Sequence, residues 1–161
     1  MPQVADPINL IVSYEELKSL PGLLTPAFDN QTISNLSHQR LAEIFQSLFF
    51  GSFHFAARMK RILLPKPKSS KKRPLTIPSP IDRIVHRSMA SVLEQIYEPI
   101  FLPVSFGFRK WRNTHMLFHE LQNWTGVRRV IRGDVSKCFD SVHHKLVLDL
   151  LAERIDDPFF L

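Results

Sequence analysis

Cysteine is almost absent from this sequence of 161 residues, because Cys138 is the only one. A small secreted module stapled by disulfides needs paired cysteines, and a structural zinc site needs several closely spaced Cys or His ligands. The sequence excludes both. A single unpaired thiol is typical of proteins that stay in a reducing compartment.

Long apolar runs are missing as well, since no stretch of 18 consecutive apolar residues occurs. We therefore expect no membrane-spanning helix and no membrane partner. The first 20 residues contain Asp6, Glu15 and Glu16 against Lys18 alone. This start fits neither a secretory signal nor an Arg-rich organellar presequence.

The common enzyme signatures are absent too: there is no Walker phosphate loop, no paired Cys/His cluster and no Gly-x-Ser-x-Gly nucleophile elbow. One carboxylate stands out, because Asp134 and Gly133 follow the strand-like residues 127–132. A carboxylate beside a glycine at the end of a strand suits a metal ion, although turns of this type are common without one. Metal-assisted phosphate chemistry is the only enzyme class that the residues indicate.

Basic residues gather in the middle of the chain. Hydrophobic residues make up 44% of the sequence and charged residues 22%, which indicates one ordinary core rather than disorder. Residues 1–57 carry a net charge of −3, residues 58–112 one of +10 and residues 113–161 one of −1. A segment this basic inside a folded sequence favours a polyanion such as nucleic acid, and the alternative is a solvated lysine-rich loop.

The first part of the chain is predicted to be helical. Ser13 and Glu16 have the spacing of a capping box that would begin a short helix ending at Leu20. Residues 21–36 are expected to form a loop. Ser37 is expected to cap a second helix that ends near Gly51, with an apolar face made of Leu41, Ile44, Phe45 and Leu48.

A projecting β-hairpin with a basic tip is predicted next, from residues 58–64 and 75–77. Its prolines fit only edge strands or turns. A long helix should follow, capped by Ser79, beginning at Pro80 and ending before Pro99.

The last third is predicted to hold a helix over residues 114–124, a strand over 127–132 and a final helix that Asp140 caps. Between residues 99 and 113 lies an irregular basic loop that contains Phe106, Phe108 and Trp111. These aromatic residues could stack on nucleic-acid bases, but composition alone favours anchoring of the loop in the core.

Six motifs, in order along the chain, resemble the reverse transcriptases encoded within group II introns, which are also called intron maturases. They are Gly22-Leu-Leu-Thr-Pro26 with Asp29 and Thr32, Arg61-Ile-Leu-Leu-Pro-Lys-Pro67, Lys72-Arg-Pro-Leu-Thr-Ile-Pro78 with Asp82-Arg-Ile-Val85, Glu94-Gln-Ile-Tyr-Glu-Pro-Ile-Phe101, Ser105-Phe-Gly-Phe-Arg109 and Gly133-Asp-Val-Ser-Lys-Cys-Phe-Asp140.

The resemblance implies an α+β fold, the fingers and part of the palm of a right-hand polymerase. This part would be mostly helical and would bear the basic β-hairpin. Residues 1–36 would be an N-terminal extension, 37–125 the fingers and 126–161 the start of the palm. The chain is thus expected to be a partial reverse transcriptase domain.

The resemblance also implies a site. Asp134 matches the first catalytic aspartate, which holds Mg²⁺ together with the backbone carbonyl of Val135. Phe139 matches the residue under the sugar of the incoming nucleotide, and Lys66 and Arg73 match basic residues that contact its triphosphate.

Intron RNA and an RNA template paired with a DNA primer are the partners that the family implies. The residues expected to bind RNA are all basic and lie in the hairpin or the aromatic loop: Lys60, Arg61, Lys68, Lys71, Lys72, Arg109, Lys110 and Arg112.

The sequence departs from the family at several places. Ala27 and Asn35 stand where glycine is usual, and no aromatic-Ala-Asp-Asp segment with the second catalytic aspartate occurs before Leu161. Asp156-Asp157 does not replace it. The chain is therefore expected to be inactive alone as a polymerase and to need a palm and thumb segment in cis or in trans.

Two other functions remain open, namely an RNA-binding splicing cofactor without catalysis and a relic recruited as a structural subunit. The acidic start favours synthesis within a mitochondrion, with a chloroplast or a bacterial cytoplasm as alternatives.

Overall fold

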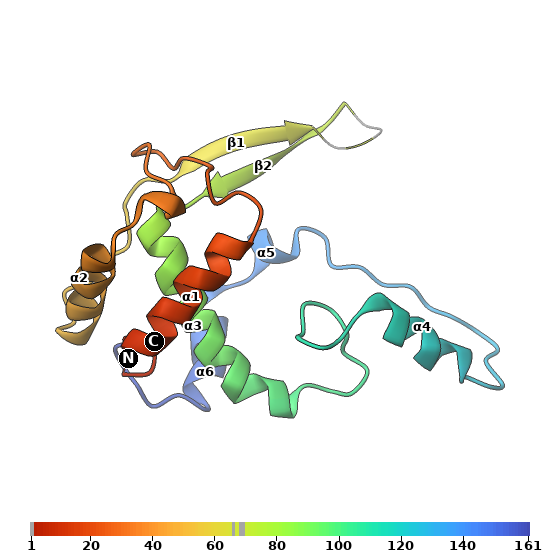
Figure 1. The fold of residues 1–161 in the computed structure, drawn as a ribbon. Helices are drawn as coiled ribbons and strands as arrows, with labels where there is room; N and C mark the ends of the chain where they lie inside the picture. Colours follow the sequence, from red (N-terminus) through yellow and green to blue (C-terminus); the bar gives the residue numbers. More distant parts are fainter. Residues whose placement is uncertain (1, 66, 68–69) are drawn as a thin grey trace. The chain divides into compact units, whose positions relative to one another are not determined.

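The computed structural model describes residues 2–65, 67 and 70–161. The chain forms two compact units, Met1–Glu94 and Gln95–Leu161, and each is considered by itself. The first contains α1 (Pro7–Ser19), the short 3₁₀ helix η1 (Ile33–Asn35), α2 (His38–Phe49), β1 (Lys60–Pro65), β2 (Lys72–Ile77) and most of α3 (Pro80–Tyr97). The second contains η2 (Glu98–Ile100), α4 (Thr114–Gln122), α5 (Cys138–Ser141) and α6 (His144–Ala152) (Figure 1).

Helix α1 begins earlier than the sequence prediction places it. The Asp6 side chain caps the helix by accepting a hydrogen bond of 2.9 Å from the Asn9 amide, and Pro7 occupies the first turn. The prediction that Ser13 begins the helix is wrong, because Ser13 is a buried residue inside it. An Asp-Pro pair is a strong start signal since proline has no amide hydrogen to satisfy and its φ angle suits the first turn.

Helix α2 confirms its prediction. The Ser37 hydroxyl accepts a hydrogen bond of 3.2 Å from the Arg40 amide, and the apolar face buries Leu41, Ile44 and Leu48. Gly51 follows the helix with a φ of 67°, a left-handed conformation that glycine adopts without steric cost.

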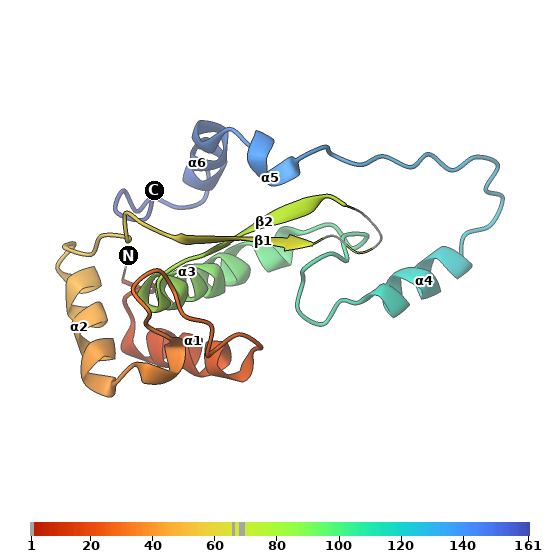
Figure 2. The same cartoon turned by 90° about the horizontal axis from the view of Figure 1, so that it is seen from above.

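Helix α3 also begins at Pro80 as predicted, and it forms the centre of the first unit. Its Ile84 and Val85 side chains have no exposed surface, and they belong to one cluster with buried residues of α1, η1 and α2. Figure 2 shows α1 lying along the underside of α3 in that view. Burial of this apolar surface is the main stabilising contribution to the unit.

A buried polar contact fixes the N-terminal segment on α3. The Ser88 hydroxyl is fully buried and donates a hydrogen bond of 2.7 Å to the Val4 carbonyl. The Asn9 side-chain amide donates to the Ser88 hydroxyl over 2.7 Å. Because buried polar groups are costly unless they are paired, these bonds fix the position of α1 on α3.

An arginine joins the same two helices nearer the surface. The Arg87 guanidinium of α3 donates to the Glu16 carboxylate of α1 and, over 3.0 Å, to Glu94. The hydrogen bond to Glu16 is the main cause that raises the pKa of Arg87, so the group stays charged.

The predicted hairpin is confirmed as an antiparallel pair of strands. Lys60 lies opposite Ile77, and Pro65 lies opposite Lys72. Both strands are edges, which explains how Pro65 and Pro74 are accommodated. In the described residues, no helix is long and apolar enough to cross a membrane.

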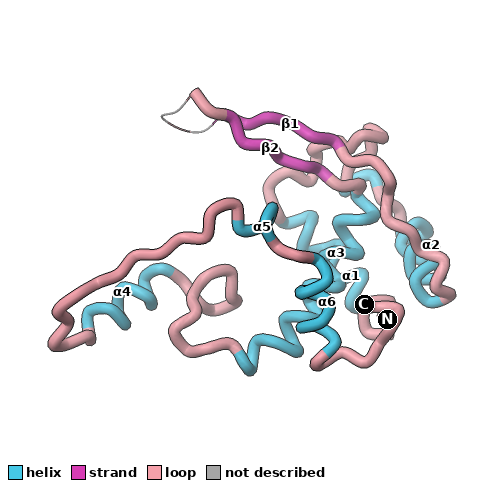
Figure 3. The backbone as a smooth tube through the Cα atoms, turned by 180° about the vertical axis from the view of Figure 1, so that it is seen from behind, coloured by secondary structure: helices cyan, strands magenta, loops and turns pink. Residues whose placement is uncertain are grey.

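The second unit differs from the prediction in two places. Residues 127–132 have no strand partner among the described residues, and Figure 3 shows the segment between α4 and α5 as loop. The predicted strand is therefore wrong: an extended segment becomes a strand only where another strand pairs with it. The Asp140 cap is also wrong, because Asp140 lies inside α5 and His143 precedes α6.

The Asp6 cap can be tested with the variant Asp6→Ala. Loss of the cap should lower the free energy of unfolding by about 1 kcal/mol, the usual value for an N-cap. Chemical denaturation followed by circular dichroism measures the change. The control Asp156→Ala removes an exposed carboxylate with no role in a cap and should change stability by less than about 0.5 kcal/mol; equal effects would contradict the assignment.

Candidate nucleic-acid interface

The hairpin carries cations on both of its faces. Residues directly opposite in an antiparallel pair share a face, and neighbours along a strand alternate. Lys60 therefore shares a face with Arg73, whereas Arg61 shares the other face with Lys72. Arg61, Lys72 and Arg73 are exposed. The hairpin can thus present positive charge in two opposite directions.

The basic residues of the hairpin that were predicted to bind RNA differ in how freely they can contact a ligand. The Lys60 ammonium donates a hydrogen bond of 3.3 Å to the Pro26 carbonyl, which ties β1 to the early loop. Lys71 is exposed just before β2. Lys66 and Lys68 lie outside the described residues.

The root of the hairpin is fastened to α3 by a buried carboxylate. Asp82 is 3% exposed, and its two carboxylate oxygens accept from the Ala56 amide at 3.2 and 3.3 Å. Beside it the Phe55 ring stacks on His86 with centroids 4.9 Å apart. Sequence reasoning noted Asp82 only as part of a motif. Its position in the first turn after Ser79-Pro80 was the available signal for a structural role.

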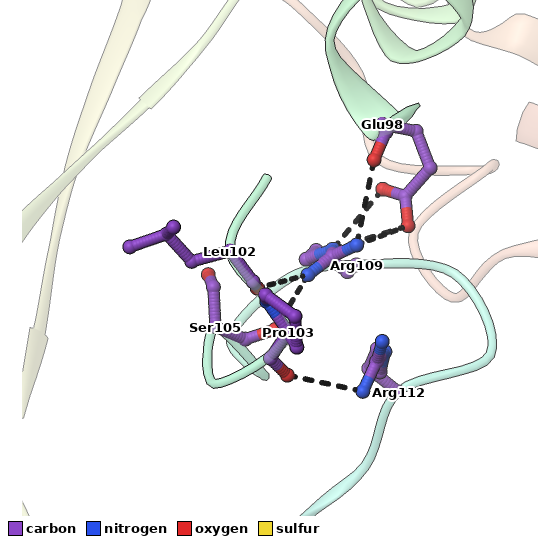
Figure 4. Close-up of polar contacts among 6 residues, drawn as sticks. All are labelled: Glu98, Leu102, Pro103, Ser105, Arg109 and Arg112. Atoms are coloured by element: carbon purple, nitrogen blue, oxygen red, sulfur yellow. Dashed lines mark hydrogen bonds and ion pairs between the residues drawn. The ribbon is translucent and has the colours of Figure 1, made fainter. Parts of the chain in front are cut away.

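The aromatic loop of the second unit is organised around Arg109 (Figure 4). Its guanidinium donates to the Glu98 carboxylate at 2.8 and 3.1 Å and to the carbonyls of Leu102 and Ser105 at 2.9 Å each. The Arg109 side chain is only 7% exposed. Because these donors are used within the chain, the geometry gives Arg109 a structural role, and the predicted RNA contact stays a prediction.

Two aromatic residues of this loop lie in solvent. Phe108 and Trp111 have positive φ angles of 58° and 62°, and their side chains are essentially fully exposed. The preference for core anchoring was therefore wrong for these two. Phe106 is half-buried, with the Arg112 guanidinium 5.4 Å from its ring centroid. Exposed aromatic rings beside the exposed Lys110 provide surfaces on which bases can stack.

The predicted metal residue Asp134 lies in an exposed loop, next to the exposed Val135. Phe139 is exposed on α5. Oxygen atoms of a carboxylate and a carbonyl suit Mg²⁺ chemically. Within the described ranges, however, no group of three acidic, His or Cys residues could hold a metal ion. The roles of these three residues stay predictions.

Residues 64–156 match the model of a protein family described as "Reverse transcriptase (RNA-dependent DNA polymerase)". The match covers more than half of the chain. The chain belongs to the reverse transcriptase family. The resemblance to reverse transcriptases that was inferred from the motifs is confirmed by this match and by the relatives described next.

Several relatives of this reverse transcriptase chain have names that refer to introns. It is 39% identical over 94% of its length to the "Uncharacterized 91 kDa protein in cob intron" of Schizosaccharomyces pombe. It is 33% identical over 91% of its length to the "Group II intron-encoded protein LtrA" of Lactococcus lactis. Over 47% of its length it is 34% identical to "Nuclear intron maturase 1, mitochondrial" of Arabidopsis thaliana.

The chain spans about a fifth to a quarter of the length of two relatives that it matches almost end to end. It covers 19% of the S. pombe protein and 24% of LtrA. These relatives are therefore several times longer than this chain, and the relatives include a protein with a mitochondrial name as well as a bacterial one.

The role of Arg109 can be tested with Arg109→Ala and Arg109→Lys. Both should increase amide hydrogen exchange between residues 98 and 112 about tenfold or more, because lysine cannot reproduce the planar fork that joins Glu98 to two carbonyls. The control Arg128→Ala removes an exposed arginine and should leave this exchange unchanged. Full protection in Arg109→Lys would show that charge alone orders the loop.

Proposed function

We propose that this chain forms the fingers and the start of the palm of a group II intron reverse transcriptase, and that it binds intron RNA. The observation that carries the proposal is the basic hairpin, which presents cations on both faces and whose second strand lies within the segment that matches the family model. Residues 37–125 would be the fingers and residues 126–161 the start of the palm, in a right-hand polymerase architecture.

The electrostatics of the hairpin support RNA as the ligand. Arg61, Lys72 and Arg73 are exposed, and phosphate contacts by such residues release counterions from nucleic acid. Lys68 and Lys71 extend the same basic sequence at the tip. Arginine binds phosphate oxygens through its planar fork and lysine acts as a compact charge, so both are suited to an RNA backbone.

Asp134 is proposed as the first catalytic aspartate of the complete site. Its carboxylate and the Val135 carbonyl would hold Mg²⁺, which supplies charge neutralisation at the phosphate undergoing transfer. A further carboxylate is required, and the aromatic-Ala-Asp-Asp segment that would carry it is not found in residues 1–161. Phe139 would pack under the sugar of the nucleotide, and Lys66 and Arg73 would contact its triphosphate.

A mitochondrial location is proposed for the chain. Two of its relatives carry mitochondrial names, from Marchantia polymorpha and from Arabidopsis thaliana. The similarity to LtrA of a bacterium makes a bacterial cytoplasm the alternative.

The hairpin's role can be tested by measuring RNA affinity at several salt concentrations. Replacing Lys72 and Arg73 with alanine should weaken binding and reduce the slope of log affinity against log salt by about 1.4, or about 0.7 for each lost phosphate contact on single-stranded RNA. The control removes Lys18 and Arg40, two exposed cations of α1 and α2 that pair with neighbouring glutamates. If both double variants lose the same affinity, net charge rather than the hairpin determines binding.

Polymerase function can be tested by complementation with a second chain that supplies an aromatic-Ala-Asp-Asp segment. Together the chains should extend a primer on an RNA template when Mg²⁺ is present. Asp134→Ala should reduce this activity at least about a hundredfold, equivalent to about 2.7 kcal/mol in the barrier. Asp140→Ala is the matched control and should keep most of the activity; the assignment fails if Asp134→Ala does the same.

A second candidate function is that of an RNA-binding splicing cofactor without catalysis. The exposed Phe108 and Trp111, together with the hairpin, favour it because they require no metal ion. RNA binding would then persist in Asp134→Ala, and complementation would restore no primer extension.

A further inference from the structure

A cavity of about 320 Å³ lies in the second unit between the loop that follows η2 and helix α4. Small-ligand pockets in proteins usually measure about 300 to 1,000 Å³, so this one suits a single small ring system. Its wall combines apolar and charged side chains, among them those of Pro103, Phe106, Arg112, Met116, His119 and Glu120.

The Arg112 side chain at the wall of this cavity is held in place. Arg112 donates a hydrogen bond of 3.1 Å to the Pro103 carbonyl, as Figure 4 shows. Its guanidinium also lies 5.4 Å from the centroid of the Phe106 ring. A guanidinium has five N–H groups, so others remain for a ligand after the bond to Pro103. Arg112 can therefore act as an oriented donor at the wall of the cavity.

The Glu120 carboxylate at this cavity is available to bind a ligand. Glu120 lies on α4, and its carboxylate makes no hydrogen bond or ion pair with the part of the chain that the structure describes. An ionised carboxylate only accepts hydrogen bonds, and it can receive two parallel N–H donors at once. The cavity thus combines a two-pronged acceptor, an oriented donor and the apolar faces of Phe106 and Met116.

We propose that this cavity binds a guanine base of single-stranded RNA. Guanine offers two neighbouring N–H donors, on N1 and the exocyclic N2, which match the two oxygens of Glu120. Its O6 and N7 atoms are acceptors, and arginine is their commonest partner. Adenine, cytosine and uracil do not combine two adjacent donors on one edge with two adjacent acceptors on another.

The surroundings favour a base within RNA over a free nucleotide. The exposed rings of Phe108 and Trp111 lie on the same loop as Phe106, so neighbouring bases of a strand have surfaces to stack on. The proposal rests on the proposed function in one respect, namely that the chain binds RNA.

The test measures binding of the full 161-residue chain to RNAs of about nine nucleotides that are all uridine except at the centre. The central base is guanine, adenine, cytosine, uracil or inosine. The RNA with a central guanine should bind about tenfold more tightly than the RNAs with a central adenine, cytosine or uracil. A tenfold difference corresponds to one bidentate contact. Inosine keeps N1–H, O6 and N7 but lacks the N2 amine, so its affinity should lie between those of guanine and adenine.

The variant Glu120→Gln should remove the preference for guanine over inosine and weaken the preference over adenine, of which the part supplied by Arg112 remains. Its affinity for the all-uridine RNA should change no more than that of the control described next. Glu153→Gln is the matched control, because it neutralises an exposed glutamate outside the cavity and should keep the preference. The inosine comparison uses the unaltered chain, so it tests the proposal even if Glu120→Gln does not fold.

The outcomes separate this proposal from the proposed function. Equal affinity for all five RNAs, or a preference for guanine over inosine that survives unchanged in folded Glu120→Gln, would overturn the guanine site while leaving RNA binding intact. No binding to any RNA would overturn the proposed function and the guanine site together.

Discussion

Polar groups buried on helix α3 hold the first unit in its arrangement. Apolar burial stabilises the unit, but it is not directional, and Ile84 or Val85 could pack against several arrangements of α1 and α2. Ser88 allows one arrangement because its hydroxyl must meet both the Val4 carbonyl and the Asn9 amide. Asp82 does the same for the segment that leads into the hairpin. The position of the basic hairpin on the unit therefore depends on two small buried polar side chains.

The elements that could be predicted from the sequence are those whose signals are local. Ser37 and Ser79-Pro80 mark helix starts within a few residues of the apolar stripes they introduce, and both helices form as expected. The hairpin was predictable because its prolines permit only edge strands. The start of α1 was missed because two cap signals compete, and the Asp6-Pro7 pair is the one that forms.

The parts that could not be predicted depend on distant partners. Residues 127–132 have the composition of a strand, yet strand formation requires a pairing partner that composition cannot reveal. For the site, charge clustering was sufficient to locate the basic hairpin but not to assign its cations to faces, since faces follow from register. The sequence likewise did not reveal that Glu98, Leu102 and Ser105 accept hydrogen bonds from the Arg109 guanidinium, because these bonds depend on how the loop folds.

Two non-glycine residues of the aromatic loop, one on either side of Arg109-Lys110, have a left-handed backbone conformation. A left-handed conformation costs a non-glycine residue roughly 1–2 kcal/mol, and Phe108 and Trp111 both adopt it. The bonds of the Arg109 guanidinium to Glu98, Leu102 and Ser105 join the segment that bears both residues to the residues before it. The backbone that directs the two exposed rings is thus tied down by one buried cation.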